Sequence, residues 1–318
     1  MTSPRRAIGT SDLNVFPLSL GGNVFGWTAD RDTSFAVLDA YTAAGGNFVD
    51  TADGYSAWVP GNTGGDSELI LGEWFTARGN RDDVVLATKV SQHPDFKGLA
   101  ADNIRRAADA SLERLQSDHI DLYYAHFDDQ TVPLEETVAA LSGLVDAGKV
   151  RYIGISNYSP ERIEEWFAIT EREGLHRAVA LQPHYNLVER AYEEKYRPLA
   201  EREQLGVMPY FALAAGFLTG KYRDGVTVDS ARAGGASKYL DETGRSVLAA
   251  LDEVSAAHGV SVATTAIAWL AAQPTITAPI ASARTLDQLP DLLAAVELEL
   301  TADELAALDG ASEAAKAA

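Results

Sequence analysis

Short apolar segments rich in β-branched residues alternate with longer amphipathic segments along almost the whole chain. We predict eight strands, at residues 16–20, 48–51, 84–90, 120–126, 150–156, 178–182, 206–211 and 276–282. Between them, apolar residues three and four positions apart predict helices at 33–44, 67–77, 101–115, 134–147, 160–173 and 192–204. Alternating strands and helices indicate a parallel sheet. Eight such units in 318 residues favour a closed (β/α)8 TIM barrel over an open doubly wound sheet.

The alternation is interrupted after the seventh predicted strand by a polar, glycine-rich stretch at residues 221–246. Ordinary loops between a strand and a helix are much shorter. The stretch is either a tolerated surface insertion or a loop that folds over a ligand. We favour the second, because barrel active sites lie on such loops.

Extra helices are expected near the C-terminus, at residues 245–258, 262–273 and 302–308. Thr301 and Glu304 have the spacing of a capping box at the start of the last one. No linker divides the chain, so we expect residues 1–318 to form a single barrel domain.

Composition excludes several classes of function. The net charge of −20 argues against binding of nucleic acid or anionic membranes, which needs clustered Lys and Arg. The absence of cysteine excludes disulfide scaffolds, thiolate metal sites and a cysteine nucleophile. No closely spaced pair of histidines suggests a metal site. No apolar run is long enough for a signal sequence or a membrane span, so we expect a cytoplasmic protein.

Polar residues stand at the ends of three consecutive predicted strands. Asp50 ends the second strand, with Tyr55 in the following loop, Lys89 ends the third and His126 ends the fourth. A lysine in an apolar strand needs a partner, and Asp50 is the candidate. An ammonium group lowers the pKa of a neighbouring phenol, and a histidine can hydrogen-bond a carbonyl oxygen. These four residues therefore suit protonation of an oxygen that receives a hydride from a nicotinamide cofactor.

Seven motifs then appear in order along nearly the whole chain: NFVDTADGYSAW, VVLATKV, DLYYAHFDD, GKVRYIGISNYS, ALQPHYNLVER, GFLTGKY and TAPIASARTLDQL. Together they resemble the aldo-keto reductases, in particular the bacterial and channel-β-like branch. The resemblance implies that Tyr55 is the general acid, that Lys89 and Asp50 tune it, and that His126 orients the substrate carbonyl.

The resemblance also implies an NADP(H) site without a Rossmann fold. Ser156, Asn157 and Gln182 match contacts to the nicotinamide carboxamide, and Tyr210 matches the ring that stacks on the nicotinamide. The other matched positions lie in the first βα loop, around the diphosphate, or near the adenosine: Gly21, Gly22, Leu213, Gly216, Lys221, Arg232, Ser282, Arg284 and Gln288. Arg284 suits the 2′-phosphate, because a guanidinium pairs bidentately with phosphate, and this favours NADP(H) over NAD(H).

Three positions depart from the family pattern: Phe211 replaces a serine in the YSPL motif that follows the seventh strand, Ser282 replaces a glycine and Leu292 replaces an asparagine. These changes bear on cofactor affinity and leave the four catalytic positions intact.

Trp27 and Trp58 are expected near the barrel mouth, where they either form an aromatic substrate pocket, which we favour, or simply cap the barrel. The predicted function is NADPH-dependent reduction of a small aldehyde or ketone to an alcohol. The alternative is a cofactor-binding, redox-sensing module with slow turnover, like channel β subunits. The substrate, the direction of the reaction and the oligomeric state stay open.

Overall fold

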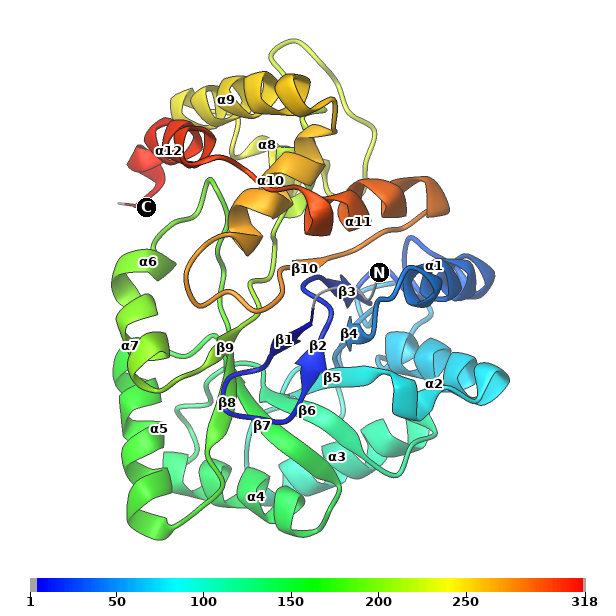
Figure 1. Cartoon of the computed structure of the whole chain (residues 1–318). Coiled ribbons are helices and arrows are strands. Elements are labelled where there is room, and N and C mark those ends of the chain that lie inside the picture. Colours follow the sequence, from blue (N-terminus) through cyan, green and yellow to red (C-terminus); the bar gives the residue numbers. More distant parts are fainter. Residues whose placement is uncertain (1–4, 317–318) are drawn as a thin grey trace.

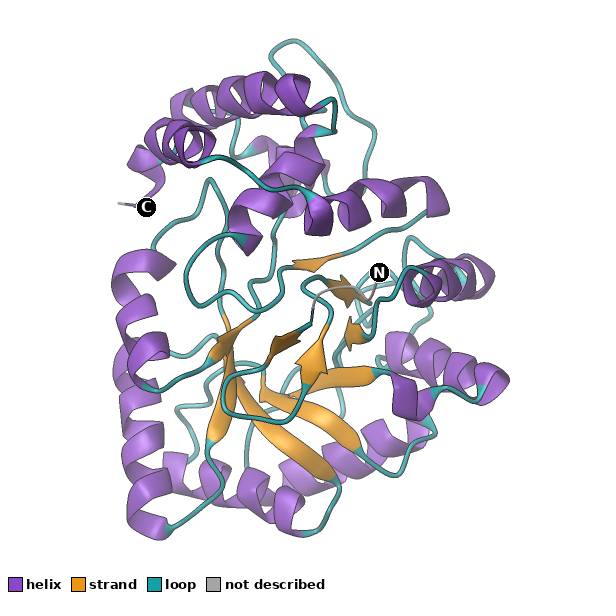
Figure 2. Cartoon of the chain, in the orientation of Figure 1, coloured by secondary structure: helices purple, strands orange, loops and turns teal. Residues whose placement is uncertain are grey.

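The computed structural model of the chain describes residues 5–316. A parallel sheet of eight strands lies inside a ring of helices, which confirms the predicted (β/α)8 barrel (Figures 1 and 2). In sheet order the strands are β10 (Ile280–Ala281), β3 (Ser19–Gly21), β4 (Phe48–Asp50), β5 (Val85–Val90), β6 (Ile120–Ala125), β7 (Val150–Ser156), β8 (Ala178–Gln182) and β9 (Gly206–Val207). A parallel bridge between Val207 and Ile276 joins β9 to the segment that leads into β10 and closes the barrel.

Helices follow the strands and cover the outside of the barrel (Figure 2). Those of the first six units are α1 (Arg31–Ala43), α2 (Asp66–Arg78), α3 (Ala101–Leu115), α4 (Leu134–Asp146), α5 (Pro160–Glu173), α6 (Tyr192–Lys195) and α7 (Arg197–Arg202), with a short 3-10 helix, η1 (Arg81–Asp83), before β5. Local signals begin these helices. The side chain of Ser159 accepts a hydrogen bond from the third residue of α5, and Pro160 occupies the first turn.

The C-terminal part adds helices on one side of the barrel, coloured yellow to red in Figure 1. They are η2 (Ala214–Thr219), α8 (Ala233–Ser237), α9 (Glu242–His258), α10 (Val262–Ala271), η3 (Leu286–Gln288), α11 (Leu289–Glu297), α12 (Ala302–Ala311) and η4 (Glu313–Lys316). The predicted capping box of Thr301 and Glu304 is present at α12. The stretch predicted as a loop at residues 221–246 lies between η2 and α9, but it is shorter than predicted because α9 begins at Glu242, and it contains the short helix α8. We call residues 221–241 the 221–241 loop.

A hairpin that the sequence analysis missed, β1 (Arg6–Ala7) with β2 (Asn14–Val15), closes the amino-terminal end of the barrel. Its turn residue Gly9 has a φ of +52°, and a Cβ there would lie 2.3 Å from the backbone oxygen of Val179 in β8. Ile8, Leu13 and Val15 of the hairpin join the apolar residues inside the barrel in one buried cluster. The other end of the barrel is left open for a site.

Prolines explain where the elements are shorter than predicted. The first, seventh and eighth barrel strands have only two or three residues, and Pro17, Pro209 and Pro279 lie beside them. Proline has no N–H for a strand ladder. The helix predicted at 192–204 is divided into α6 and α7, because Pro198 cannot bond to the preceding turn and begins a new helix instead.

Candidate active site

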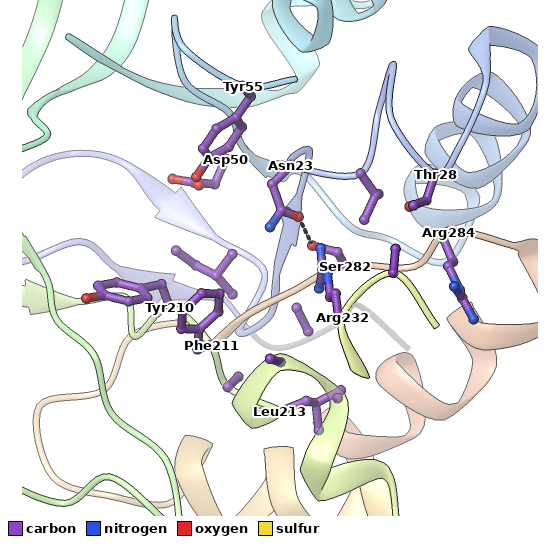
Figure 3. Close-up of a pocket in the computed structure, with 18 of the residues that line it drawn as sticks. Asn23, Thr28, Asp50, Tyr55, Tyr210, Phe211, Leu213, Arg232, Ser282 and Arg284 are labelled. Carbon is purple, nitrogen blue, oxygen red and sulfur yellow. Dashed lines mark hydrogen bonds between the residues drawn. The ribbon is translucent and has the colours of Figure 1, made fainter. Parts of the chain in front are cut away.

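A cavity of about 970 Å³ lies at the carboxyl ends of the barrel strands. Its lining combines residues that end or follow each of the strands β3 to β9 with residues of the 221–241 loop and the segment after β10. Figure 3 shows Tyr55 and Asp50 at one end of the cavity and Arg284 at the other, with Arg232 and Ser282 between them. The 221–241 loop contributes Lys221, Ser230, Ala231 and Arg232, which favours its interpretation as a loop over a ligand.

The ammonium group of Lys89 is completely buried, and three acceptors surround it. Lys89 Nζ donates to Asp50 Oδ1 at 2.6 Å, to the backbone oxygen of Thr51 at 2.6 Å and to Tyr55 Oη at 3.1 Å. Three acceptors use all three ammonium hydrogens. Because Tyr55 accepts one of them, its own hydroxyl hydrogen remains free to point into the cavity.

Gln182 supports this arrangement from the opposite side of the barrel. Its Nε2 donates to Asp50 Oδ2 at 2.8 Å, so both oxygens of this buried carboxylate have a partner. Ser156 Oγ donates to the backbone oxygen of Gln182 at 2.9 Å. The sequence analysis assigned Gln182 to a cofactor carboxamide and missed its contact with Asp50. The contact crosses the barrel between non-neighbouring strands, and no local sequence signal indicates it.

A second set of hydrogen bonds orders the cavity floor. Asn157 Nδ2 donates to the backbone oxygen of His126 at 2.9 Å, and Asn157 Oδ1 accepts from Tyr210 Oη at 2.9 Å. The ring of Tyr210 stacks on His184, with centroids 5.2 Å apart and planes 12° from parallel. One face of Tyr210 is therefore fixed by the protein, and the residue itself lines the cavity.

Burial is the largest influence on the pKa values of the titratable side chains in the site. Burial raises the pKa of Tyr55 above its usual value, and the ammonium of Lys89 offsets only part of that rise. Burial lowers the pKa of Lys89, but Asp50 and Tyr55 together raise it by more, so the amine stays charged. Burial, with a smaller contribution from Lys89, places the pKa of His126 well below its usual range, so its imidazole is neutral near pH 7.

Three cations converge at the other end of the cavity, and none has a carboxylate within salt-bridge distance among residues 5–316. They are Lys221, Arg232 and Arg284. Arg232 Nη2 is buried without a hydrogen-bond partner in this part of the chain. Burial and the charge of Arg284 lower the pKa of both Lys221 and Arg232. An anion placed among them would relieve their mutual repulsion.

The first βα loop and the last segment meet beside these cations. Ser282 Oγ donates to Asn23 Oδ1 at 2.7 Å (Figure 3). A Cβ at Gly21 would lie 2.5 Å from Ser282 Oγ, so a larger residue there would displace this hydroxyl. Gly22 is similarly confined, with Ser67 Oγ 2.8 Å from where its Cβ would be. The backbone N–H of Arg284 donates to Gln288 Oε1 at 3.1 Å.

Most of the residues proposed from the sequence line this cavity. Those that line it are Asp50, Tyr55, His126, Gly21, Asn157, Gln182, Tyr210, Leu213, Gly216, Lys221, Arg232, Ser282, Arg284, Gln288 and Trp58. Lys89, Ser156 and Gly22 lie immediately behind the lining, where they are buried. Asn23, Thr28, Phe127 and Phe211 also line it and were not proposed. Asn23, Thr28 and Phe127 lie one to eight residues beyond a predicted strand end and Phe211 ends a predicted strand, and this proximity is the signal that could have found them.

The two tryptophans occupy different positions. Trp58 is 52% exposed and lines the cavity, whereas Trp27 is half-buried and does not. Trp27 instead packs edge to face against Trp58, with ring centroids 5.6 Å apart and planes at 89°. Of the two tryptophans predicted to form an aromatic substrate pocket, only Trp58 lines the cavity, and the prediction for Trp27 is corrected: it packs behind Trp58.

The acidic and histidine side chains and the helices of residues 5–316 indicate neither a metal centre nor a single membrane-spanning helix. This part of the chain holds no group of three His, Cys, Asp or Glu side chains placed to bind a metal ion. None of its helices is by itself long and apolar enough to cross a membrane. Only α9 and α10 together reach that length and composition, and they meet at an angle of 98°.

Comparison with known proteins agrees with this geometry. Residues 17–313 match the family model described as "Aldo/keto reductase family". The chain is 34% identical to "Norsolorinic acid reductase B" of Aspergillus parasiticus, covering 97% of this chain and 84% of that protein. It is 36% identical to "Uncharacterized oxidoreductase YrpG" of Bacillus subtilis, over 95% and 94% of the two chains. It is also 36% identical to "Probable voltage-gated potassium channel subunit beta" of Oryza sativa subsp. japonica, over 92% and 90%.

Proposed function

Because the chain belongs to the aldo/keto reductase family, a family of oxidoreductases, we propose that it is an NADP(H)-dependent enzyme that reduces a small aldehyde or ketone to an alcohol. One observation carries the proposal. Lys89 donates to Tyr55 Oη, which leaves the tyrosine hydroxyl hydrogen available to a substrate oxygen in the cavity. A phenol held in this way by an ammonium is a general acid for an alkoxide.

In this proposal each of the four polar residues has a separate role. Tyr55 donates its proton to the carbonyl oxygen as negative charge develops there. Lys89 remains charged and stabilises the phenolate that results, and Asp50 holds Lys89 in position. His126, whose ring centroid lies 6.2 Å from that of Tyr55, is neutral and can donate a hydrogen bond to the same carbonyl oxygen.

The cation group at the far end of the cavity supports a phosphorylated cofactor. The buried, unpartnered Nη2 of Arg232 fits a diphosphate oxygen, together with Lys221 and the backbone around Leu213 and Gly216. Arg284 is placed to pair with a 2′-phosphate, while Ser282 and Gln288 would contact the ribose. When bound, the nicotinamide cofactor supplies the hydride.

At the catalytic end of the cavity, other residues would hold the nicotinamide. Asn157, Gln182 and Ser156 would hold its carboxamide. Tyr210, which His184 supports from one side, would carry its ring. Gly21 and Gly22 let the first βα loop pack closely against Ser282 and Ser67, which holds this loop beside the proposed cofactor site.

A redox-sensing module is the alternative, and the rice relative named as a probable channel β subunit is the observation that favours it. Both functions need the same cofactor site. They differ in turnover, because a sensor retains its cofactor and turns over slowly, whereas an enzyme completes many cycles.

The test is absorbance-monitored oxidation of NADPH, and separately of NADH, with an aryl aldehyde and a dicarbonyl. We expect steady multiple turnover with NADPH and its loss in Tyr55→Phe. Tyr152→Phe is the matched control, because Tyr152 loses the same hydroxyl from β7 and does not line the cavity. Retention of wild-type turnover in Tyr55→Phe would refute the assignment of the acid. Cofactor binding with only slow turnover would favour the sensor.

A further inference from the structure

Arg232 makes a contact on its other side that the cofactor does not explain. Its guanidinium carbon lies 5.4 Å from the centroid of the Trp27 ring, within the range of a cation–π contact. Trp27 belongs to the first βα loop, and Arg232 belongs to the 221–241 loop, about two hundred residues later. The contact therefore links the loop over the cofactor to a residue outside the cavity.

A continuous set of ring contacts leads from Trp27 to the catalytic tyrosine. Trp27 packs edge to face on Trp58, and the Trp58 ring centroid lies 6.3 Å from that of Tyr55. Edge-to-face aromatic pairs are directional, so the orientation of one ring restricts the other. Trp58 is the exposed member of the set and the wall of the cavity beside Tyr55.

The backbone that carries these rings is already held in place. Asn62 Nδ2 donates to the backbone oxygens of Gly26 and Ser56, at 3.0 and 3.2 Å, and Ser56 Oγ donates to the backbone oxygen of Phe25 at 2.8 Å. These bonds join the loops that carry Trp27 and Trp58. The two indole rings contact each other, and Arg232 is the charged group that lies over the Trp27 ring.

We propose that Trp27 is a positioning residue that transmits the position of Arg232 to Trp58, so that the substrate pocket takes its final shape when an anion fixes Arg232. The proposal rests on the proposed function, because the anion would be the cofactor diphosphate. It gives the chain a physical reason to bind cofactor before carbonyl substrate.

The first experiment needs no turnover. Two indole rings in edge-to-face contact couple their electronic transitions, and the resulting couplet is visible by circular dichroism. Its loss in Trp27→Leu and in Trp58→Leu would assign it to this pair. We expect Arg232→Met to weaken the couplet. Inorganic diphosphate, which is optically silent, should strengthen it in the wild type but not in Arg232→Met.

Arg223→Met is the matched control. It is the same substitution in the same loop, but Arg223 is paired with Asp252 and does not line the cavity. We expect its couplet and its response to diphosphate to equal those of the wild type. A couplet in Arg232→Met that equals the wild type, with the same response to diphosphate, would overturn the proposal.

The second experiment measures the KM of an aryl aldehyde at saturating NADPH. A residue that only binds cofactor would leave this KM unchanged. Loss of a cation–π contact predicts an increase of about threefold to tenfold in Arg232→Met. In a Trp27→Leu background, Arg232→Met should cause no further increase in KM, because the contact from Arg232 through Trp27 to Trp58 is already lost. Trp27→Phe, which keeps an aromatic ring, should restore most of the wild-type KM.

The two proposals fail in different ways. If the wild type neither binds nor oxidises NADPH, the proposed function fails, while the couplet still decides whether Arg232 positions the indole pair. If the wild type oxidises NADPH normally and the effects of Arg232→Met and Trp27→Leu on KM are additive, the proposed enzymatic function holds and the proposed coupling through Trp27 fails.

Discussion

Replacement of Lys89 by methionine tests separately what this residue contributes to the stability of the fold and what it contributes to turnover. Methionine has nearly the length of the lysine stem and no charge, so the fully buried side chain is replaced with little change in packing. The substitution removes three donated hydrogen bonds and leaves the Asp50 carboxylate buried, with only Gln182 as a donor.

The Asp50 carboxylate, which loses its ion-pair partner, determines how much stability the Lys89→Met variant loses. Removing one partner of a buried ion pair costs about 3–5 kcal/mol, because the remaining charge is uncompensated. A protein with a typical free energy of unfolding of about 5–15 kcal/mol can bear this loss and still fold. Lys89→Met with Asp50→Asn removes both charges and keeps an oxygen that accepts from Gln182. We expect the double variant to recover more than half of the loss.

Turnover should not recover with stability. Without the ammonium nothing offsets the burial that raises the pKa of Tyr55, and the phenolate left after proton transfer is unsupported. General acid catalysis contributes about 10²- to 10⁴-fold, and we expect a loss of that size in both the single and the double variant.

Urea unfolding at neutral pH gives the free energies, and NADPH oxidation with an aryl aldehyde gives the rates. A double variant that is as unstable as Lys89→Met would show that the unpaired Asp50 carboxylate does not cause the loss in the free energy of unfolding. A single variant that keeps turnover within about tenfold of the wild type would refute the role of the ammonium, because the expected loss is larger.

Three further predictions test other parts of the structure. Burial raises the pKa of Asp53 to about 7, so the folded state holds a proton that the unfolded state releases near pH 4. The stabilising effect of this proton is complete below about pH 4 and is lost as the pH rises through about 7, a change of roughly 4 kcal/mol in the free energy of unfolding. Urea titrations of Asp53→Asn should not show this change, whereas those of the exposed control Asp95→Asn should. Gly72→Ala places a Cβ 2.1 Å from a backbone oxygen of α3 and should lower the free energy of unfolding by about 1–3 kcal/mol, whereas Gly143→Ala, with open space around it, should raise it by about 0.5–1 kcal/mol. Arg284→Met should weaken NADPH binding about tenfold to a hundredfold in calorimetric titrations and leave NADH binding nearly unchanged, since a charged hydrogen bond to the 2′-phosphate is worth about 1.5–3 kcal/mol.

The sequence predicted those parts of the site that depend on neighbouring parallel strands. Asp50 ends β4, Lys89 is the last residue but one of β5, and His126 directly follows β6. The carboxyl ends of adjacent parallel strands meet at one edge. The contact between Lys89 and Asp50 therefore follows from strand order alone. The predicted barrel follows in the same way from eight repeats of one unit.

Contacts across the barrel could not be predicted in this way. Gln182 reaches Asp50 from β8, and their separation depends on how the closed barrel brings non-neighbouring strands together. The position of Trp27 outside the cavity depends on the edge-to-face contact with Trp58, which no spacing in the sequence encodes. Burial also governs the pKa of Tyr55, so charge pairing alone gave an incomplete account of its acidity.

Backbone strain gathers at the same end of the barrel as the buried charges. Nine non-glycine residues within 5–316 have positive φ, and six of them lie in the segments that follow barrel strands, two of these at the start of η2: Ser56, Ser91, Asn157, Phe211, Ala214 and Ala215. Left-handed φ/ψ costs about 1–2 kcal/mol for such residues, so the surrounding structure must compensate. Asn157 illustrates the compensation, because its φ of 56° is accompanied by side-chain bonds to the His126 carbonyl and the Tyr210 hydroxyl. The amino-terminal end, closed by the β1–β2 hairpin, bears no comparable cluster in the part of the chain described. Substitutions that stabilise the fold without loss of turnover should therefore be found at the hairpin end and not around the cavity.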